Sequence, residues 1–376
     1  MKSLARPWPE ASPSLLAPVA EHADLRAVVR QILDDHASHE KVRVSAESPL
    51  GYAPELWKLL NQEMSLSALA VPEARGGLGY GLRELGVVLE ECGRALVCEP
   101  VLASAVLGVQ SLLRAPEGVA EELLQPAVRG DVVVTMAPLE PGHVDAVAVG
   151  GDGWAVHGRL PRVLQGGAAD AVMLLAGTEA GPALFAVDLR DAPVRREELT
   201  TIDLRRRQAA LIFEGASAAL LVPPERAHEA TAVLHDLARA SLACEHVGVV
   251  DRMLSMTLDH VSQRHQFGRP LGSFQVIKHR LADMLVDLER SRSAARYAAS
   301  VWTDDPKGAS LAADVAAAVC TEATLRATAD AVQLHGGIAF TWEHEAHYYV
   351  RRALGDEPLF GDARGARARI AEQVGV

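Results

Sequence analysis

The sequence predicts a mainly α-helical protein with a β domain inserted in the middle. Apolar residues recur at helical spacing before residue 118 and again after residue 225. Between about residues 120 and 222 the pattern changes to short runs of valine, alanine and leucine punctuated by glycine, proline and aspartate. A chain of 376 residues exceeds the usual size of a single core. We therefore expect three domains, namely a helical domain over 1–118, a β domain over 119–224 and a helical bundle over 225–376.

Composition and charge exclude several classes of protein. A formal net charge of -12 argues against binding a nucleic-acid backbone, which requires a basic face. The first residues carry prolines and acids where a signal peptide has its apolar core, and no run of eighteen apolar residues predicts a membrane span. The four cysteines form no Cys-x-x-Cys pair, which is typical of a reducing compartment. These features predict a cytoplasmic protein.

The N-terminal region is expected to be helical after a proline-rich lead that ends near Ala20. Apolar spacing predicts helices over 24–36, 53–62 and 82–96. A loop separates the last two, because Pro72 ends the preceding segment and four glycines follow it within ten residues.

The middle region contains six short apolar runs that predict strands. They read VVVTMAPL, DAVAVG, WAVHG, DAVMLLAG, ALFAVDL and AALIFEG. Beyond Pro223 the pattern becomes helical again, over 226–263, 273–303, 307–335 and 344–354. Long antiparallel helices of this kind favour a four-helix bundle.

One stretch near the start of the bundle has the composition of an anion site. It runs from Arg264 to Met284 and reads RHQFGRPLGSFQVIKHRLADM. Arg264 and Arg269 offer forked donors suited to a phosphate or pyrophosphate. Gly268 and Gly272, with Pro270 between them, interrupt one helix, so that the next begins with its amide groups exposed and Gln275 near its first turn. The alternative is an ordinary helix-turn-helix whose arginines cover a solvated surface.

This stretch resembles the C-terminal domain of the acyl-CoA dehydrogenase family, in which an Arg-x-x-Phe-Gly turn and a following Phe-Gln contact FAD. The run from Gln333 to Gly337 looks like the family's second flavin signature, and Pro-Glu-x-x-Gly-Gly-x-Gly from Pro72 is similar to its N-terminal domain. The resemblance covers nearly the whole chain. It implies a small β-barrel in the middle, a C-terminal four-helix bundle and a dimer or tetramer. The FAD-binding residues that it implies are Arg264, Phe267, Gly268, Gln275, Gln333, Leu334, His335, Gly336 and Gly337.

The resemblance also implies a reaction, the α,β-desaturation of an acyl-CoA thioester. In the family a carboxylate base removes the Cα proton while the β-hydrogen leaves as hydride to FAD, and an electron-transfer flavoprotein is one candidate acceptor. Such a base requires a desolvated carboxylate beside the flavin. The family's two base positions correspond here to Gly361 and Ala238, so neither carries an acid. Glu357 would need a shift of one helical turn to reach the first position.

Glu245 is the preferred candidate base. It lies seven residues after Ala238, close to the same helix face, and its neighbours Ala243, Cys244 and Gly248 are small. A glutamate in such surroundings can lie against a ligand cavity. The alternative is that Glu245 is solvated or paired, because the same helix also carries polar residues.

The β domain departs from the family pattern. Classical members line the flavin ring with a Thr-Glu-Pro-x-x-Gly-Ser-Asp loop and a Trp-Ile-Thr strand, whereas this chain reads TMAPLEPGHVD and RVLQGGAAD, with Arg162-Val163-Leu164 replacing the second motif. In the family each FAD lies across a subunit boundary. A chain that keeps the residues for the FAD diphosphate but has lost those that line the flavin ring could complete the flavin site of a partner subunit without building its own. We therefore hypothesise one subunit of a heteromeric enzyme, similar to bacterial enzymes that act on bulky, steroid-derived acyl-CoAs.

Two other functional classes stay open. One is a non-catalytic subunit that uses the fold only to support a partner, and the other is a relative that oxidises or hydroxylates a non-CoA substrate. The run WEHEAH resembles a metal motif, but His344 and His347 lack an evident third ligand, so no metal site is expected. The absence of a Gly-x-Ser-x-Gly elbow and of a P-loop argues against the commonest hydrolases and nucleoside triphosphatases.

Overall fold

The computed structural model describes residues 19–151, 153–190, 192–304 and 308–376, so nearly all of the proline-rich lead lies outside the described residues. Within these ranges the α-helices are α1 (Ala20–His36), α2 (His39–Glu47), α3 (Pro54–Met64), α4 (Leu82–Ala95), α5 (Val109–Leu112), α6 (Glu121–Arg129), α7 (Pro224–Gln263), α8 (Gln275–Asp304), α9 (Ser310–His335), α10 (Ala346–Asp356) and α11 (Ala363–Val374). The shorter helical segments are η2 (Leu66–Ala68), η3 (Glu73–Arg75), η4 (Val101–Gly108), η5 (Leu271–Ser273) and η6 (Gly336–Phe340).

The helices predicted from apolar spacing are confirmed. Each of the seven corresponds to one of α1, α3, α4, α7, α8, α9 and α10, with ends that differ by a few residues. The glycine loop before α4 is also present, after η3. Among the described helical elements of eight residues or more, four were not predicted, namely α2, α6, α11 and the π-helical η4.

The strands occupy the predicted middle region. They are β1 (Val134–Met136), β2 (Val144–Ala148), β3 (Trp154–Leu164), β4 (Ala171–Thr178), β5 (Gly181–Asp188), β6 (Val194–Glu198) and β7 (Gln208–Val222). A separate hairpin pairs β8 (His265–Gln266) with β9 (Arg269–Pro270). All six predicted strands are confirmed, whereas β6 was not predicted because its sequence VRREE lacks an apolar pattern.

The chain forms two compact units, and each is discontinuous in sequence. Unit 1 comprises residues 1–39, 82–97 and 239–376, and unit 2 comprises 40–81 and 98–238. The long helix α7 contributes residues to both. The predicted domains are continuous stretches of sequence with boundaries at 118 and 224, whereas these units are discontinuous. The predicted boundaries therefore stay predictions.

Unit 2 contains a closed β-barrel. The strands pair in the order β4-β2-β3-β7-β5, and β5 pairs again with β4, which closes the ring. The parallel strand β1 extends from β4, and β6 pairs with β7 outside the ring. Closure leaves the ring without a free edge. Strands β4 and β5 are almost wholly buried, as their continuous runs of valine, leucine and alanine predict.

The π-helix η4 packs against β1 within unit 2. The hydroxyl of Ser104, which is fully buried, accepts a 3.0 Å hydrogen bond from the backbone N–H of Val134. A Cβ on Gly108 would lie 2.5 Å from the carbonyl oxygen of Val134, so only glycine permits this approach. Eight residues of π-helix are unusual, because most π-helices are single-turn bulges.

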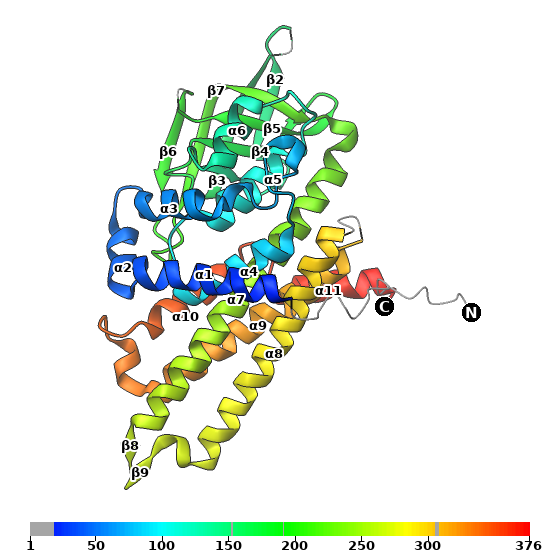
Figure 1. The fold of residues 1–376 in the computed structure, drawn as a ribbon. Helices are drawn as coiled ribbons and strands as arrows, with labels where there is room; N and C mark the ends of the chain where they lie inside the picture. Colours follow the sequence, from blue (N-terminus) through cyan, green and yellow to red (C-terminus); the bar gives the residue numbers. More distant parts are fainter. Residues whose placement is uncertain (1–18, 152, 191, 305–307) are drawn as a thin grey trace, which may run out of the picture. The chain divides into compact units, whose positions relative to one another are not determined.

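Unit 1 is a helical bundle around α7, α8 and α9, which run side by side in Figure 1. Helices α10 and α11 pack on α9, and α1 packs on α4. Ion pairs tie the helices together at buried carboxylates. Asp314 on α9, fully buried, is held by Arg239 of α7 and Arg369 of α11. Glu90 on α4, also buried, is held by Arg26 of α1 and Arg296 of α8.

Helices α4 and α7 cross with their backbones in contact. A Cβ on Gly248 would lie 1.7 Å from the carbonyl oxygen of Glu90, and one on Gly93 would lie 2.0 Å from that of Glu245. The two glycines therefore set the distance between the helices, and this contact fixes where Glu245 lies in unit 1.

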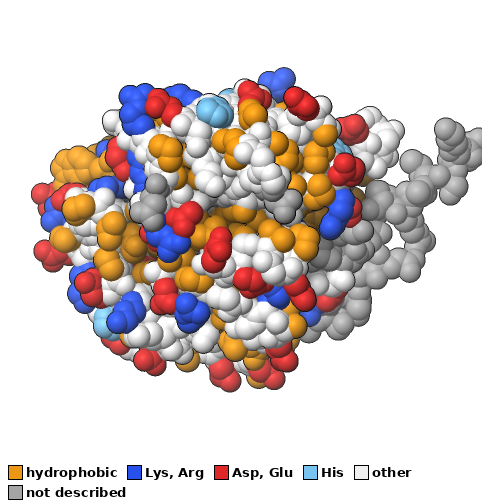
Figure 2. Space-filling model, turned by 90° about the horizontal axis from the view of Figure 1, so that it is seen from above, with side chains coloured by type: hydrophobic (Ala, Val, Ile, Leu, Met, Phe, Trp, Pro, Cys, Tyr) orange, Lys and Arg blue, Asp and Glu red, His pale blue; other side chains and the backbone are white. Residues whose placement is uncertain are grey.

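No helix in the described part of the chain is long and apolar enough to cross a membrane. The face of the molecule drawn in Figure 2 carries acidic and basic side chains interspersed with hydrophobic ones. Its lysines and arginines stand among acids rather than forming one basic surface.

Candidate functional site

The predicted anion-binding turn lies at one tip of unit 1, between the end of α7 and the start of α8 (Figure 1). There the β8–β9 hairpin turns through Phe267 and Gly268, which have φ angles of 54° and 77°. Two successive residues with positive φ form the mirror-image turn that matches the twist of a two-residue hairpin. The Phe267 side chain is 90 % exposed, so the turn presents an aromatic ring to its surroundings.

Arginine and aromatic side chains gather on this hairpin. The guanidinium carbon of Arg269 lies 3.9 Å from the centre of the Phe274 ring, a cation–π contact. The ring of Phe267 meets the same phenylalanine edge-on, with 6.2 Å between centroids. Arg264 is exposed, and its backbone carbonyl accepts a 2.8 Å hydrogen bond from Leu271, which closes the base of the hairpin. The hairpin and its base thus place two arginines at the surface.

The second predicted signature reaches the same end of the bundle. His335 is the last residue of α9, and its ring stacks on that of His260, in the last turn of α7, with 4.3 Å between centroids. After it, Gly336 has a φ of 68°, and a Cβ on either Gly336 or Gly337 would meet nothing within 4 Å. The fold therefore brings together, at neighbouring helix ends, two motifs that lie roughly seventy residues apart in the sequence.

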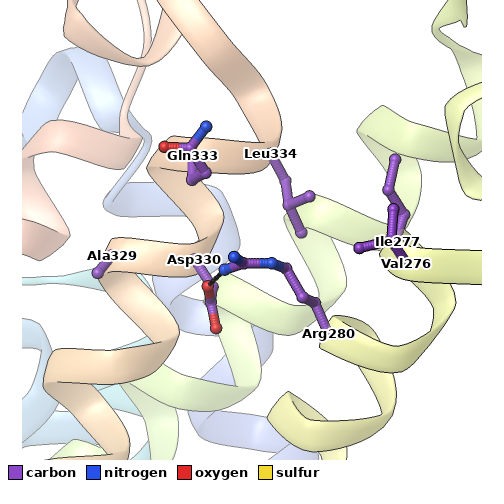
Figure 3. Close-up of a pocket in the computed structure, with 7 residues that line it drawn as sticks. All are labelled: Val276, Ile277, Arg280, Ala329, Asp330, Gln333 and Leu334. Carbon is purple, nitrogen blue, oxygen red and sulfur yellow. Dashed lines mark hydrogen bonds and ion pairs between the residues drawn. The ribbon is translucent and has the colours of Figure 1, made fainter.

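A pocket of about 410 Å³ opens between α8 and α9 beside these motifs. Figure 3 shows Val276, Ile277 and Arg280 on α8 facing Gln333 and Leu334 on α9. Arg280 forms an ion pair with Asp330 across the pocket. Two of the predicted cofactor residues, Gln333 and Leu334, line this pocket, and Gln275 begins the helix on its other side.

Three histidine rings, called the histidine stack below, are in contact at this end, with His335 stacked on His260 and edge-on to His344. Besides its contact with His260, the His335 ring lies 4.8 Å from that of His344, edge to face. Burial lowers the pKa of His260, and the nearby His335, His344 and Arg264 lower it further. Burial likewise lowers the pKa of His344, helped by His335 and Arg252 and opposed by Glu345. His260 and His344 were not predicted as cofactor-binding residues, because neither belongs to a flavin signature.

The donor set fits the diphosphate and sugar portion of a flavin dinucleotide. Arg264 and Arg269 supply charge, and Gln275 and Gln333 supply amides. Nε2 of His335 is buried and has no hydrogen-bond partner among the described residues. A buried polar atom without a partner calls for an explanation, and a ligand atom is one. Gly336 and Gly337 leave room for a ligand to approach the backbone.

Glu245, the predicted base, lies inside unit 1 and is 3 % exposed. Its Oε1 accepts a 2.5 Å hydrogen bond from Nη1 of Arg352 on α10, which is 1 % exposed. One residue further along α7 and four residues further along α10, Nε2 of His246 lies 3.4 Å from Oδ2 of Asp356. These two contacts join α7 to α10 through buried polar side chains. The catalytic role of Glu245 stays a prediction.

In unit 2, the segments that would line a flavin ring bond to each other. The hydroxyl of Thr135, on β1, donates a 2.7 Å hydrogen bond to the carbonyl of Leu164, at the end of β3. Val163 and Leu164 are buried. Gln165 has a positive φ of 53°, donates from its amide to the carbonyl of Cys98 at 3.0 Å and is also buried. Two of the three replacement residues, Val163 and Leu164, are therefore part of the barrel's own packing, whereas Arg162 is exposed.

The histidines of the metal-like run WEHEAH make contacts with other aromatic rings. His344 belongs to the histidine stack, and the His347 ring packs against Trp342 and Tyr348. Within the residues that the structure describes, no three histidine, cysteine or acidic side chains are grouped to hold a metal ion.

Comparison with known proteins identifies the family. The model of the acyl-CoA dehydrogenase N-terminal domain matches residues 19–131, and that of the C-terminal domain matches residues 230–375. The acyl-CoA dehydrogenase IpdE2 of Mycolicibacterium smegmatis is 33% identical over 355 residues, which cover 93% of this chain and 97% of the relative. The chain belongs to the acyl-CoA dehydrogenase family.

Two solved structures resemble this chain over nearly its whole length. A variant of the Tcur3481-Tcur3483 steroid ACAD is 32% identical, with a TM-score of 0.85, over 94% of this chain and 98% of that one. The ChsE4-ChsE5 complex of Mycobacterium tuberculosis is 29% identical, with a TM-score of 0.87, over 96% and 98%. The predicted fold class and family are confirmed, and members of the family are FAD-dependent oxidoreductases.

Proposed function

We propose that this chain is one subunit of a heteromeric acyl-CoA dehydrogenase that desaturates a bulky, steroid-derived acyl-CoA between Cα and Cβ. Its own part is to hold the diphosphate and adenosine end of an FAD whose ring lies in a second, related subunit. When bound, FAD supplies the acceptor for the hydride that leaves Cβ. The names of the similar steroid ACAD and of the ChsE4-ChsE5 complex support both the substrate class and the mixed assembly.

One observation carries this proposal, which is that the flavin residues point outward at a helix-bundle tip. Phe267 is 90 % exposed, and the two glycines after His335 face open space. Meanwhile Thr135 and Leu164, on the ring side of the barrel, are bonded to each other. In this chain the residues that would bind the diphosphate are exposed, and the barrel segments that would line the flavin ring differ from the family pattern. This combination is expected of a chain that completes the flavin site of another subunit.

In this assembly the chain's residues have separate tasks. Arg264 and Arg269 would neutralise the diphosphate, and Gln275 and Gln333 would orient the sugar and adenine. The residues at the two base positions of the family are Gly361 and Ala238, which cannot remove a proton. The partner subunit would then supply the base, unless Glu245 does so.

The test is to express the chain alone and together with a related chain encoded beside it. We expect the chain alone to purify with little flavin, and the pair to purify as a yellow complex whose native mass equals a sum of both chains. Under anaerobic conditions a steroid-derived acyl-CoA should bleach the flavin of the pair. Full flavin occupancy and turnover by the chain alone would refute the division of labour.

A further inference from the structure

The histidine stack occupies the ends of two helices. His260 lies in the last turn of α7, and His335 ends α9. The carbonyl end of a helix favours a positive charge, so both dipoles favour an imidazolium at this place. The same dipoles disfavour a bare anion, although the residues around the stack have the composition of an anion site.

Hydrogen bonds determine where a proton can be added. Nδ1 of His335 lies 2.7 Å from the carbonyl oxygen of Ala331. A carbonyl can only accept, so this nitrogen carries the hydrogen and Nε2 is bare when the ring is neutral. Nδ1 of His344 accepts a 3.2 Å hydrogen bond from the N–H of Ala346, so protonation there would break a bond. Protonation of Nε2 of His335 breaks none, because that atom has no partner in the described chain.

Burial and the surrounding groups disfavour a proton on the two outer histidines, His260 and His344. Arg264 acts on His260, and Arg252 and Glu345 act on His344. Glu345, the acid among them, forms an ion pair with Arg252. Burial and mutual repulsion lower the pKa of both outer histidines. Nε2 of His335, which has no partner in the part of the chain that the structure describes, is then the atom that can take a proton without losing a hydrogen bond when a negative group arrives.

We propose that a diphosphate ester bound beside the Gly336–Gly337 turn draws one proton onto Nε2 of His335, so that ligand binding is coupled to proton uptake. The proposal rests on the proposed function for the identity of the ligand, the diphosphate of FAD. The imidazolium then donates to a phosphate oxygen and satisfies the buried nitrogen. It also offsets the unfavourable dipole of α9, which makes His335 the residue that renders a helix C-terminus suitable for an anion.

The experiment counts protons by calorimetry. The co-purified assembly is stripped of flavin and titrated with FAD at about pH 7.5, above the ordinary histidine range, in two buffers of different ionisation enthalpy. We expect uptake of about one proton per FAD bound, since a neutral ring becomes charged. Riboflavin, which lacks the diphosphate, should bind without uptake. His335→Asn should abolish the uptake, whereas His36→Asn, at an exposed histidine of α1, should leave it unchanged.

A second variant identifies the nitrogen that takes the proton. His260→Phe keeps an aromatic ring against His335 but cannot be protonated, so the uptake should persist. Loss of uptake in His260→Phe together with its retention in His335→Asn would overturn the proposal. FAD binding without proton uptake would also overturn it and would leave the proposed function standing. Failure of the assembly to bind FAD at all would instead refute the proposed function. Proton uptake on binding coenzyme A but not on binding FAD would mean that the diphosphate bound here belongs to the acyl-CoA substrate. That result would overturn the coupling of proton uptake to FAD binding.

Discussion

At the scale of single residues, the pairing of Glu245 with Arg352 has the largest expected consequence. Both side chains are almost fully buried, and their pair links α7 to α10. Such a pair is costly to break from one side, because the remaining charge stays buried. The same glutamate is also the chain's candidate base, so stability and catalysis must be measured separately.

A pair of variants separates these two roles. Glu245→Gln should lower the free energy of unfolding by about 3–5 kcal/mol, because it removes the carboxylate that faces Arg352. The double change Glu245→Met with Arg352→Met removes both charges at similar volume and should restore most of that stability. Urea denaturation gives the stability, and anaerobic flavin bleaching of the assembled enzyme gives the activity. A double variant that is stable yet inactive would identify Glu245 as the base, and a stable, active one would assign it a structural role.

At the scale of elements, the ends of α7 and α9 are in contact through the rings of His260 and His335. The contact between these two imidazoles is weakened when both are protonated, because two charged rings at 4.3 Å repel each other. The end of the bundle should therefore be its pH-sensitive part.

The direction of this sensitivity follows from the lowered pKa values of His260 and His344. A histidine whose folded pKa lies below its ordinary value of 6.5 stabilises the fold above that pH. The stabilisation is lost as the pH falls from about 6.5 through the lowered folded pKa, because the unfolded chain binds the proton more tightly. The flavin-free chain should thus lose stability toward acid more steeply than its His260→Phe variant. Urea titrations across this pH range test the difference, and parallel curves for the two proteins would contradict it.

At the scale of the whole molecule, the proposed FAD site is shared between two chains. Substitutions in it should therefore change FAD binding by the assembly rather than the stability of this chain. Arg264→Gln changes an exposed side chain and should leave unfolding of this chain unaffected. It should nevertheless weaken FAD binding by the co-purified assembly by roughly 10- to 100-fold, the equivalent of about 1.5–3 kcal/mol for a charged hydrogen bond. Fluorescence titration of FAD into the stripped assembly measures the change. Arg364→Gln, at an exposed arginine of α11, is the control, and equal affinities for both variants would contradict a diphosphate grip at Arg264.

The sequence by itself determined the long helices, the strands of the barrel and the family. Helices such as α7 and α8 repeat their apolar spacing over many turns, and the barrel strands are apolar runs bounded by turn residues, so local pattern suffices. The flavin signatures were recognisable for the same reason, since each is a short contiguous motif. Elements with weak patterns were missed. Helix α11 buries chiefly Ala363 and Ala366 and is held by Arg369 on Asp314, a contact that no local window contains.

Only the tertiary structure decided which distant side chains meet. It paired Glu245 with an arginine 107 residues away, where the sequence left a solvated, paired or catalytic role open. It also stacked His260 on His335, although the sequence marks only the second as a site residue. Neither contact was readable in advance, because the packing of helices sets the distance between side chains that are remote along the chain. The close crossing of α4 and α7 at Gly93 and Gly248 is one such packing contact. Residue spacing along α7 alone therefore could not predict what surrounds Glu245.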